Sequence, residues 1–270
     1  HDGSIVAIGA AHADGKDTNL PFWEREVYPH GQVKIYKNEN GNWTQIGADI
    51  NGDISGSNKF SGWSVNLSSD GSIVGIGGQS RVWNKVYQNV NNHWTHINQD
   101  MVDVRSSGQT SLSADGSIFA IAYDNGGVKR NGIVSIYENV AGLWTEIGDS
   151  IEAERGADEE SSFGEALQLS EDGSTIAIGV PYTNHMTTAG LVRVYKNIGN
   201  SWVKIGNDIE GEKSPDEFGM GVSLSSDGSI VAIGAPSDHT NGVWGDSTTI
   251  YGGSVRIYQN INNSWVQMGD

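Results

Sequence analysis

The chain has 270 residues, of which 36% are hydrophobic, so it is long enough to bury a sizeable core. Its 33 acidic residues outnumber its 16 basic ones, and the resulting formal charge of −17 argues against nucleic acid and anionic membrane surfaces as partners. The chain has no cysteine, which excludes disulfides and thiolate metal sites, and no apolar run approaches the roughly 18 residues that a membrane helix needs.

The chain opens on "HDGSIVAIGA", which corresponds to the middle of a later segment, "LSSDGSIVAIGAP". We therefore expect the sequence to be a piece of a longer polypeptide. Its Asp-Gly-Ser returns at intervals of 45 to 68 residues, the spacing of repeat architectures that are built from small sheets. Five repeats are predicted, anchored at Asp2, Asp70, Asp115, Asp172 and Asp227.

Each repeat also contains a segment like "YKNENGNWTQIG", which first occurs at Tyr36. In every copy an Asn follows the Tyr by two positions and a Trp follows it by seven. The residues between them include Asn-Gly, Asn-Asn, Ala-Gly or Gly-Asn pairs, which suit tight hairpin turns. The pattern predicts a hairpin of constant length whose aromatic side chains pack between neighbouring sheets.

The strands are clearest in the fifth repeat, where alternating or short β-branched runs occupy 221–225, 229–236, 253–260 and 264–269. Four antiparallel strands per repeat make a blade that cannot bury a core alone, so we expect one all-β domain over residues 1–270, a β-propeller of four-stranded antiparallel blades. The first blade lacks its inner strand. Both a five-bladed ring and a ring with further blades stay open.

The segment "FGMGVSLSSDGSIVAIGAP" (218–236) resembles the FG-GAP repeat of integrin α-subunit propellers, with Phe-Gly opening the first strand and Gly-Ala-Pro ending the second. The fourth repeat agrees through Phe163 and Gly179, and the second keeps Gly62 with its aromatic residue shifted to Phe60. The turn "S-x-D-G-S" is also similar to that of WD-repeat and TolB-type propellers.

Many FG-GAP repeats carry a calcium loop, Asp-x-Asp-x-Asp-Gly, whereas the connection here is only "SSDGS" or "SEDGS". One carboxylate per turn cannot assemble the six to eight oxygens that calcium takes, so these turns are interpreted as structural and no cofactor is expected there. The acidic linkers between repeats could bind calcium or a basic partner, or could simply be solvated. Their carboxylates are Asp158, Glu159, Glu160, Asp216 and Glu217.

Long loops between the second and third strands are expected at 10–31 in the first repeat and 235–253 in the fifth, on one face of the propeller. Their carboxylates and imidazoles could bind a metal or sugar hydroxyls, and their Trp side chains could stack on a ligand; the alternative is that the loops are solvated and fold over the rim. The candidate ligand-binding residues are His12, Asp14, Asp17, Trp23 and His30 in the first loop, and Asp238, His239, Trp244, Asp246 and Tyr251 in the second.

Sequons at hairpin tips make Asn42 and Asn262 candidates for glycosylation if the protein is secreted, whereas Asn66 falls in an inner strand and should be bare. No nucleophile elbow, phosphate-binding loop or His-rich zinc site is present, and no pair of carboxylates stands out. We therefore expect no enzyme.

The repeats and the FG-GAP resemblance favour an extracellular or cell-surface module of adhesion or scaffold type. It would bind a protein or a glycan through its loop-bearing face, and it could assemble into a larger complex. A carbohydrate-binding propeller is the first alternative, and a glycoside-active enzyme is the second.

Overall fold

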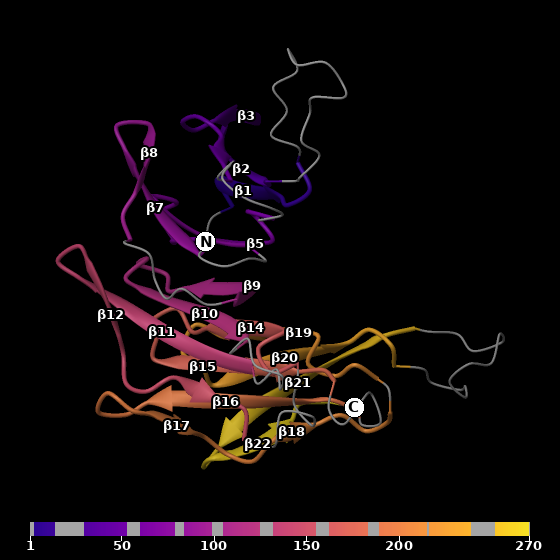
Figure 1. The fold of residues 1–270 in the computed structure, drawn as a ribbon. Coiled ribbons are helices and arrows are strands. Elements are labelled where there is room, and N and C mark those ends of the chain that lie inside the picture. The colour runs from indigo at the N-terminus through magenta and orange to yellow at the C-terminus, as the bar shows by residue number, and fades with distance from the viewer. Residues whose placement is uncertain are drawn as a thin grey trace. The chain divides into compact units, whose positions relative to one another are not determined.

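The computed structural model describes most of the chain, the side chains at 105–107 and 124 excepted. All regular structure within the described residues is β, with 22 strands in five antiparallel sheets (Figure 1). No helix there is long and apolar enough to cross a membrane. The described residues are 3–13, 30–52, 60–78, 84–98, 105–124, 132–154, 162–182, 189–214, 216–238 and 252–269.

The chain divides into two compact units, and the division passes through the third sheet. Unit 1 comprises residues 1–121 and 138–145, and unit 2 comprises residues 122–137 and 146–270.

The first two sheets belong to unit 1. The first sheet begins with the strand that corresponds to the second strand of the other repeats, so the missing inner strand of the first blade is confirmed for the described residues. The first sheet contains β1 (Ile5–Ala10), β2 (Gln32–Glu39), β3 (Asn42–Gln45) and β4 (Ile50–Asn51); the second contains β5 (Ser64–Leu67), β6 (Ile73–Gly77), β7 (Lys85–Val90) and β8 (His93–His96).

The other three sheets repeat the same meander of inner strand, two central strands and outer strand. They confirm the predicted blades of four antiparallel strands. The third sheet contains β9 (Arg105–Leu112), β10 (Ile118–Asp124), β11 (Gly132–Val140), β12 (Leu143–Glu146) and β13 (Ile151–Glu152); the fourth contains β14 (Ala166–Leu169), β15 (Thr175–Val180), β16 (Leu191–Asn197), β17 (Trp202–Lys204) and β18 (Ile209–Glu210); the fifth contains β19 (Gly221–Leu224), β20 (Ile230–Ala235), β21 (Ser254–Ile261) and β22 (Ser264–Gln267).

Three sheets carry a short additional strand that the sequence pattern did not predict. β4, β13 and β18 pair with the start of the third strand of their repeats, on the edge that the outer strand leaves uncovered. In the fourth sheet Ile209 lies opposite Val192, and both are buried. Each short strand therefore inserts one isoleucine into the core.

The Asp-Gly-Ser turns are structural, as predicted. In the second repeat the Asp70 carboxylate accepts hydrogen bonds from the Ser68 hydroxyl (2.7 Å) and the backbone N–H of Ser72 (2.9 Å). Gly71 adopts φ +70°, which glycine reaches without steric cost. The carboxylate thus closes the hairpin.

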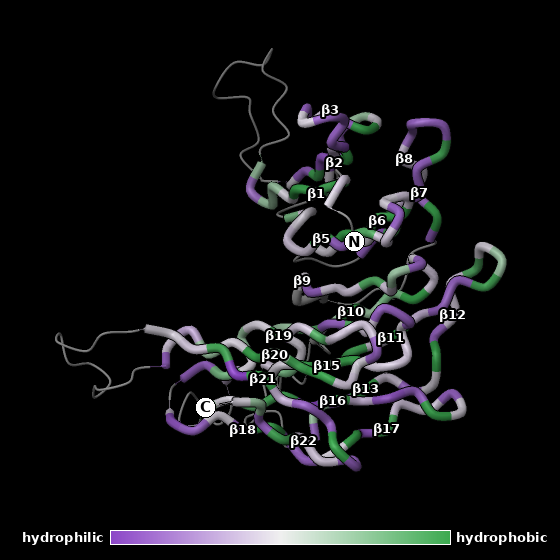
Figure 2. The backbone as a smooth tube through the Cα atoms, turned by 180° about the vertical axis from the view of Figure 1, so that it is seen from behind, coloured by the Kyte–Doolittle hydropathy of each residue, from purple (hydrophilic) through white to green (hydrophobic). Residues whose placement is uncertain are grey.

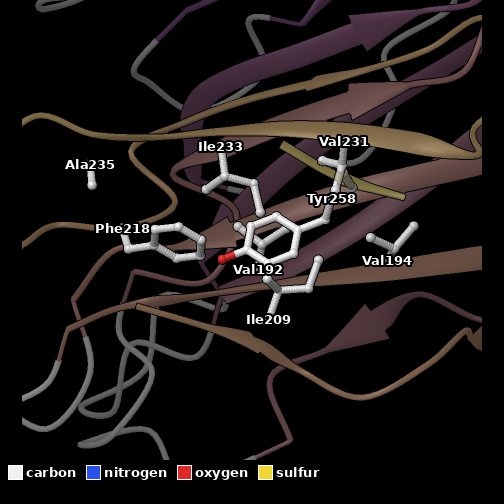
Figure 3. Packing of buried hydrophobic residues seen from close by; sticks show 9 residues of the cluster. Val192, Val194, Ile209, Phe218, Val231, Ile233, Ala235 and Tyr258 are labelled. Atoms are coloured by element: carbon white, nitrogen blue, oxygen red, sulfur yellow. The ribbon is translucent and has the colours of Figure 1, made fainter. Parts of the chain in front are cut away.

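The hydrophobic core lies between consecutive sheets. Val192, Val194 and Ile209 of the fourth sheet meet Val231 and Ile233 of the fifth, all buried (Figure 3). The central strands β15 and β20 are hydrophobic over most of their length (Figure 2). Burial of both faces of a sheet by its neighbours is the packing of propeller blades.

Candidate functional site

Three polar side chains meet at one end of the fourth and fifth sheets. This end, where β15 and β20 finish and β14 and β19 begin, is called the strand-end face of unit 2. The Tyr182 hydroxyl, after β15, donates a 3.2 Å hydrogen bond to Oε1 of Glu217, and the Ser237 hydroxyl, after β20, donates a 2.8 Å bond to Oε2. The linker before the fifth blade therefore carries a carboxylate that joins two repeats.

The backbone holds Glu217 in an uncommon conformation. Its φ is +57°, a region that non-glycine residues rarely enter and that costs about 1 kcal/mol or more. The next residue, Phe218, is completely buried, and the backbone N–H of Met220 donates to the carbonyl oxygen of Glu217 at 3.1 Å. The buried Phe and this turn fix the direction in which the Glu217 side chain leaves the linker.

Glu165 lies close enough to influence this group electrostatically. The Glu165 side chain is exposed, but the surrounding protein partly desolvates its carboxyl and raises its pKa. Desolvation together with the charges of Glu217 and Glu165 raises the pKa of the Tyr182 hydroxyl. Among the described residues, no ion pair joins a basic side chain to Glu165 or Glu217. We call Glu165, Tyr182 and Glu217 the acidic rim.

Asp238, one of the predicted ligand-binding residues, forms an ion pair with Arg256 next to the acidic rim. Asp238 is buried, and its Oδ2 lies 3.2 Å from Nη2 of Arg256, which also lies 3.3 Å from Glu212. The guanidinium of Arg256 stands 5.7 Å from the ring centre of Phe218. The structure thus places Asp238 in a buried ion pair; its role as a ligand-binding residue stays a prediction.

The corresponding end of unit 1 carries aromatic side chains instead. The ring centre of His12 lies 5.2 Å from that of Phe60 and 6.3 Å from that of Trp63. His12 is exposed, and Trp63 is 42% exposed. The structure therefore brings one predicted residue, His12, onto an accessible aromatic cluster.

The other predicted site residues have mixed placements. His30 is buried, and Asn42 and Asn262 are exposed at hairpin tips, where their glycosylation stays a prediction. The described residues contain no group of three His, Asp or Glu that could hold a metal ion, and calcium binding by the linkers stays a prediction. The residues that lie outside the described ranges are Asp14, Asp17, Trp23, His239, Trp244, Asp246, Tyr251, Asp158, Glu159 and Glu160.

The sequence analysis missed Trp63, Glu165 and Tyr182. Trp63 and Glu165 share one position, directly after the glycine that opens the inner strand, and Met220 holds it in the fifth repeat. The side chains of Trp63, Glu165 and Met220 are exposed at this position. Alignment of the repeats on this glycine would have shown that the constant frame leaves the following residue free to vary.

Comparison with known proteins gives a fold but no family. No protein-family model matches the chain, and no curated protein matches it. Among solved structures, the chain is similar to a candidate 6-phosphogluconolactonase from Bacteroides fragilis, with a TM-score of 0.54, 13% identity, and coverage of 88% of this chain and 63% of that one. A candidate 6-phosphogluconolactonase from Bacteroides uniformis gives 0.56, 13%, 89% and 64%.

A third likeness is to Sqt1 of Chaetomium thermophilum, solved bound to the N-terminus of the ribosomal protein L10, with a TM-score of 0.50, 11% identity, and coverage of 87% of this chain and 55% of Sqt1. In all three comparisons the chain spans less than two thirds of the solved chain. These are propeller-type folds, in agreement with the blades described above.

The same likenesses correct the predicted function. The adhesion- or scaffold-type module, with its carbohydrate-binding and glycoside-active alternatives, is wrong, because the similar structures are candidate 6-phosphogluconolactonases and Sqt1. The reason is physical: repeated blades specify a frame, and propellers with the same frame carry unrelated functions at their loops. The extracellular or cell-surface location stays a prediction.

Proposed function

We propose that this chain is a non-catalytic binding protein that takes a basic peptide segment of a protein partner on the acidic rim of unit 2. One observation carries the proposal. Glu165 and Glu217 present two carboxylates beside a Tyr hydroxyl, with no described cation paired to either.

Electrostatics makes this rim suited to a Lys or Arg side chain. The surrounding protein partly desolvates the exposed carboxyl of Glu165 and raises its pKa, which means that the charged form is disfavoured there. An arriving guanidinium or ammonium would restore a counter-charge and would form charge-assisted hydrogen bonds, each worth about 1.5–3 kcal/mol. The net charge of −17 would also attract a basic segment from a distance.

The likeness to Sqt1 supports a peptide as the partner, because Sqt1 was solved with the N-terminus of a ribosomal protein. The match shows the fold alone, so the choice of a basic segment rests on the acidic rim and the net charge. We also propose that the repeats are an FG-GAP type without the calcium loop, which the Phe-Gly pairs at 163–164 and 218–219 support.

The test is fluorescence anisotropy with labelled short peptides that are graded in Lys and Arg content. Affinity should rise with the number of basic residues and fall with salt. Glu165→Gln or Glu217→Gln should weaken binding about tenfold, which corresponds to the loss of one charge-assisted contact. The matched control is Glu171→Gln, because Glu171 is also exposed but lies at the opposite end of β14.

Equal affinities for Glu165→Gln and Glu171→Gln would overturn the acidic rim as the binding site. Hydrolysis of a phosphorylated sugar lactone that depends on Glu165 would overturn the non-catalytic reading instead. The two failures are distinguishable because the first is seen in binding and the second in turnover.

A further inference from the structure

The fifth sheet carries an open groove on the face that points away from the fourth. Its volume is about 560 Å³, and its lining includes Met220, Gly234, Pro236, Gly253 and Val255. Val255 is 69% exposed, and Ile257, two residues further along β21, is 41% exposed. A central strand of a blade thus shows apolar side chains to solvent.

The same place on the fourth sheet is filled. Val192 and Val194, which correspond to Val255 and Ile257, are buried there in one apolar cluster with Phe218, Val231 and Tyr258 of the next repeat (Figure 3). A Cβ on Gly219 would lie 3.2 Å from the Val192 side chain. The backbone N–H of Phe218 donates a 2.9 Å hydrogen bond to the carbonyl oxygen of Ala189.

Glycines make this close approach possible. A Cβ on Gly179 would lie 2.0 Å from the carbonyl oxygen of Gly219, and a Cβ on Gly190 would lie 2.3 Å from that of Phe218. The corresponding glycines of the fifth sheet have no such neighbour: the nearest atom to a Cβ on Gly234 is 3.7 Å away, and to one on Gly253 it is 3.2 Å away. The fifth sheet therefore has the same groove as the fourth, but no described segment of the chain fills it.

Two further junctions use the same kind of occupant. A Cβ on Gly132 of the third sheet would lie 2.1 Å from the carbonyl oxygen of Phe163, and one on Gly31 of the first sheet would lie 2.0 Å from that of Ser61. Phe163 and Ser61 each precede the glycine that opens the next inner strand, as Phe218 does. In all three cases the groove of one blade receives the opening segment of the following repeat.

We propose that the groove of the fifth sheet binds the opening segment of a further blade of the same repeat type, a residue followed by Gly at the start of a strand, with Phe before the Gly in two of the three filled junctions and Ser in the third. The solved propeller-type structures are longer than this chain, which covers 63% and 64% of two of them. Because the same groove is filled by the opening segment of the next repeat at the three other junctions, we expect a segment of the same kind in the groove of the fifth sheet.

A second exposed region of the fifth sheet, at its outer hairpin, indicates that a whole blade and not only its opening segment would pack there. At the junction of the fourth and fifth sheets, the Trp265 indole donates to the carbonyl oxygen of Ile205, and Gly206 N–H donates to Asn263. The corresponding residues at the far side of the fifth sheet are Met268 and Gly269. Met268 is 47% exposed, and a Cβ on Gly269 would meet nothing within 4 Å.

A second copy of this chain is a poorer occupant. Its first blade could offer Trp43, which is 49% exposed, to the Met268 carbonyl. That blade has no inner strand in the described residues and hence no aromatic-Gly segment to fill the groove. A copy would satisfy one of the two open contacts.

The test supplies the occupant as a peptide with the sequence of residues 216–225, "DEFGMGVSLS", added to the intact chain. Saturable binding by anisotropy, with protection of β20 and β21 from hydrogen exchange, is expected. Replacing Phe or the first Gly of the peptide by Ala should reduce affinity at least tenfold. On the protein, Gly234→Ala should do the same without changing the fold, and Ser264→Ala, on exposed β22, should have no effect.

A longer chain in which residues 212–270 are repeated after Asp270 provides the second measurement, because fusion raises the effective concentration of the occupant. Protection of β21 in the fusion, lost with Gly234→Ala, is expected. Binding or protection that ignores Gly234→Ala overturns the proposal, and so does the absence of protection in both formats. Self-association of the unmodified chain that Trp43→Ala abolishes would assign the groove face to a second copy instead.

Discussion

The indole Nε1 of Trp202 donates a 2.9 Å hydrogen bond to the carbonyl oxygen of Ile147, 55 residues earlier in the chain. Trp202 lies in the outer strand of the fourth sheet, and Ile147 follows the outer strand of the third. The outer hairpin of one repeat is thereby fastened to the turn of the preceding repeat. This contact explains why the segment around the Trp is repeated so closely.

The same relationship recurs within each unit. Trp94 donates to Ile46 in unit 1 and Trp265 donates to Ile205 in unit 2, each at 2.9 Å. Asn92 accepts a second hydrogen bond from the backbone N–H of Gly47. These Trp side chains, together with the turn residues Asn92 and Asn263 in two of the junctions, therefore act as a latch between consecutive sheets. The third repeat departs from this pattern, because Nε1 of Trp144 is buried without a hydrogen-bond partner among the described residues.

The first prediction tests this latch. Trp202→Phe keeps an aromatic ring but leaves the Ile147 carbonyl without its donor, so we expect the free energy of unfolding to fall by about 1–2 kcal/mol. Urea unfolding followed by circular dichroism measures the change. Trp43→Phe is the matched control, because Trp43 is half exposed and should lose less than about 0.5 kcal/mol. Equal losses in the two variants would contradict the latch.

The second prediction concerns acid stability. The hydrogen bond from the backbone N–H of Ser229 to Asp227, with those from the Ser225 and Ser229 hydroxyls, lowers the pKa of Asp227 to about 2. The bond from the Ser72 N–H likewise lowers the pKa of Asp70. Because the folded state prefers the ionised carboxylate, this stabilisation is present above the unfolded pKa of about 3.9 and is lost as the pH falls toward 2.

Asp227→Asn should therefore make the loss of stability between about pH 4 and pH 2 less steep, and adding Asp70→Asn should flatten it further. The measurement is the urea midpoint as a function of pH. Ser225→Ala provides an independent check, since removal of this donor should raise the pKa of Asp227 and weaken the same dependence. An unchanged acid slope in Asp227→Asn would mean that the turns do not cause it.

Much of the fold follows from local pattern. The fifth repeat was predicted to have strands at 221–225, 229–236, 253–260 and 264–269, and β19 to β22 lie within or one residue beyond these ranges. Alternation of apolar residues and the turn dipeptides both act over a few residues, so they are visible in the sequence. The sequence pattern did not predict the short strands β4, β13 and β18, because a strand of two residues is too short to show an alternation of apolar and polar side chains.

The candidate site was harder to predict because it depends on register between distant segments. Tyr182 and Glu217 are 35 residues apart, and they meet only because one follows β15 and the other precedes β19. The long loops attracted the prediction through their His, Asp and Trp content. A single exposed residue that varies between repeats, such as Glu165, is harder to notice in the sequence than a long polar loop. In the structure, however, the strand that follows gives this residue a fixed position.

The third prediction concerns a buried ion pair in unit 2. Arg193 is 1% exposed, and its Nε and Nη2 donate to the two carboxylate oxygens of Asp208 at 3.1 and 2.9 Å. Burial alone would raise the pKa of Asp208, but the hydrogen bonds from Arg193 and Lys204 lower it. Asp208→Asn should reduce the free energy of unfolding by about 3–5 kcal/mol, because it leaves a buried guanidinium without its main counter-charge.

Lys204→Met is the control for this pair. Lys204 also lies 3.0 Å from Asp208, but it is 30% exposed, so its loss should reduce stability by no more than about 1 kcal/mol. Chemical denaturation at neutral pH compares the two variants directly. A loss in Lys204→Met as large as that in Asp208→Asn would show that the partly exposed lysine, and not the buried arginine, depends on this carboxylate.

The fourth prediction separates two glycines that occupy the same position in consecutive blades. A Cβ on Gly179 would lie 2.0 Å from the carbonyl oxygen of Gly219, where backbone on both sides prevents relaxation, whereas a Cβ on Gly234 would have 3.7 Å of clearance. Gly179→Ala should therefore reduce the free energy of unfolding by at least about 2 kcal/mol, as overpacking does. Gly234→Ala should leave stability unchanged or raise it by up to about 1 kcal/mol, because alanine restricts the unfolded chain. Thermal and urea unfolding of both variants measure the difference, and similar losses would mean that the strand itself, not the junction between blades, requires glycine at this position.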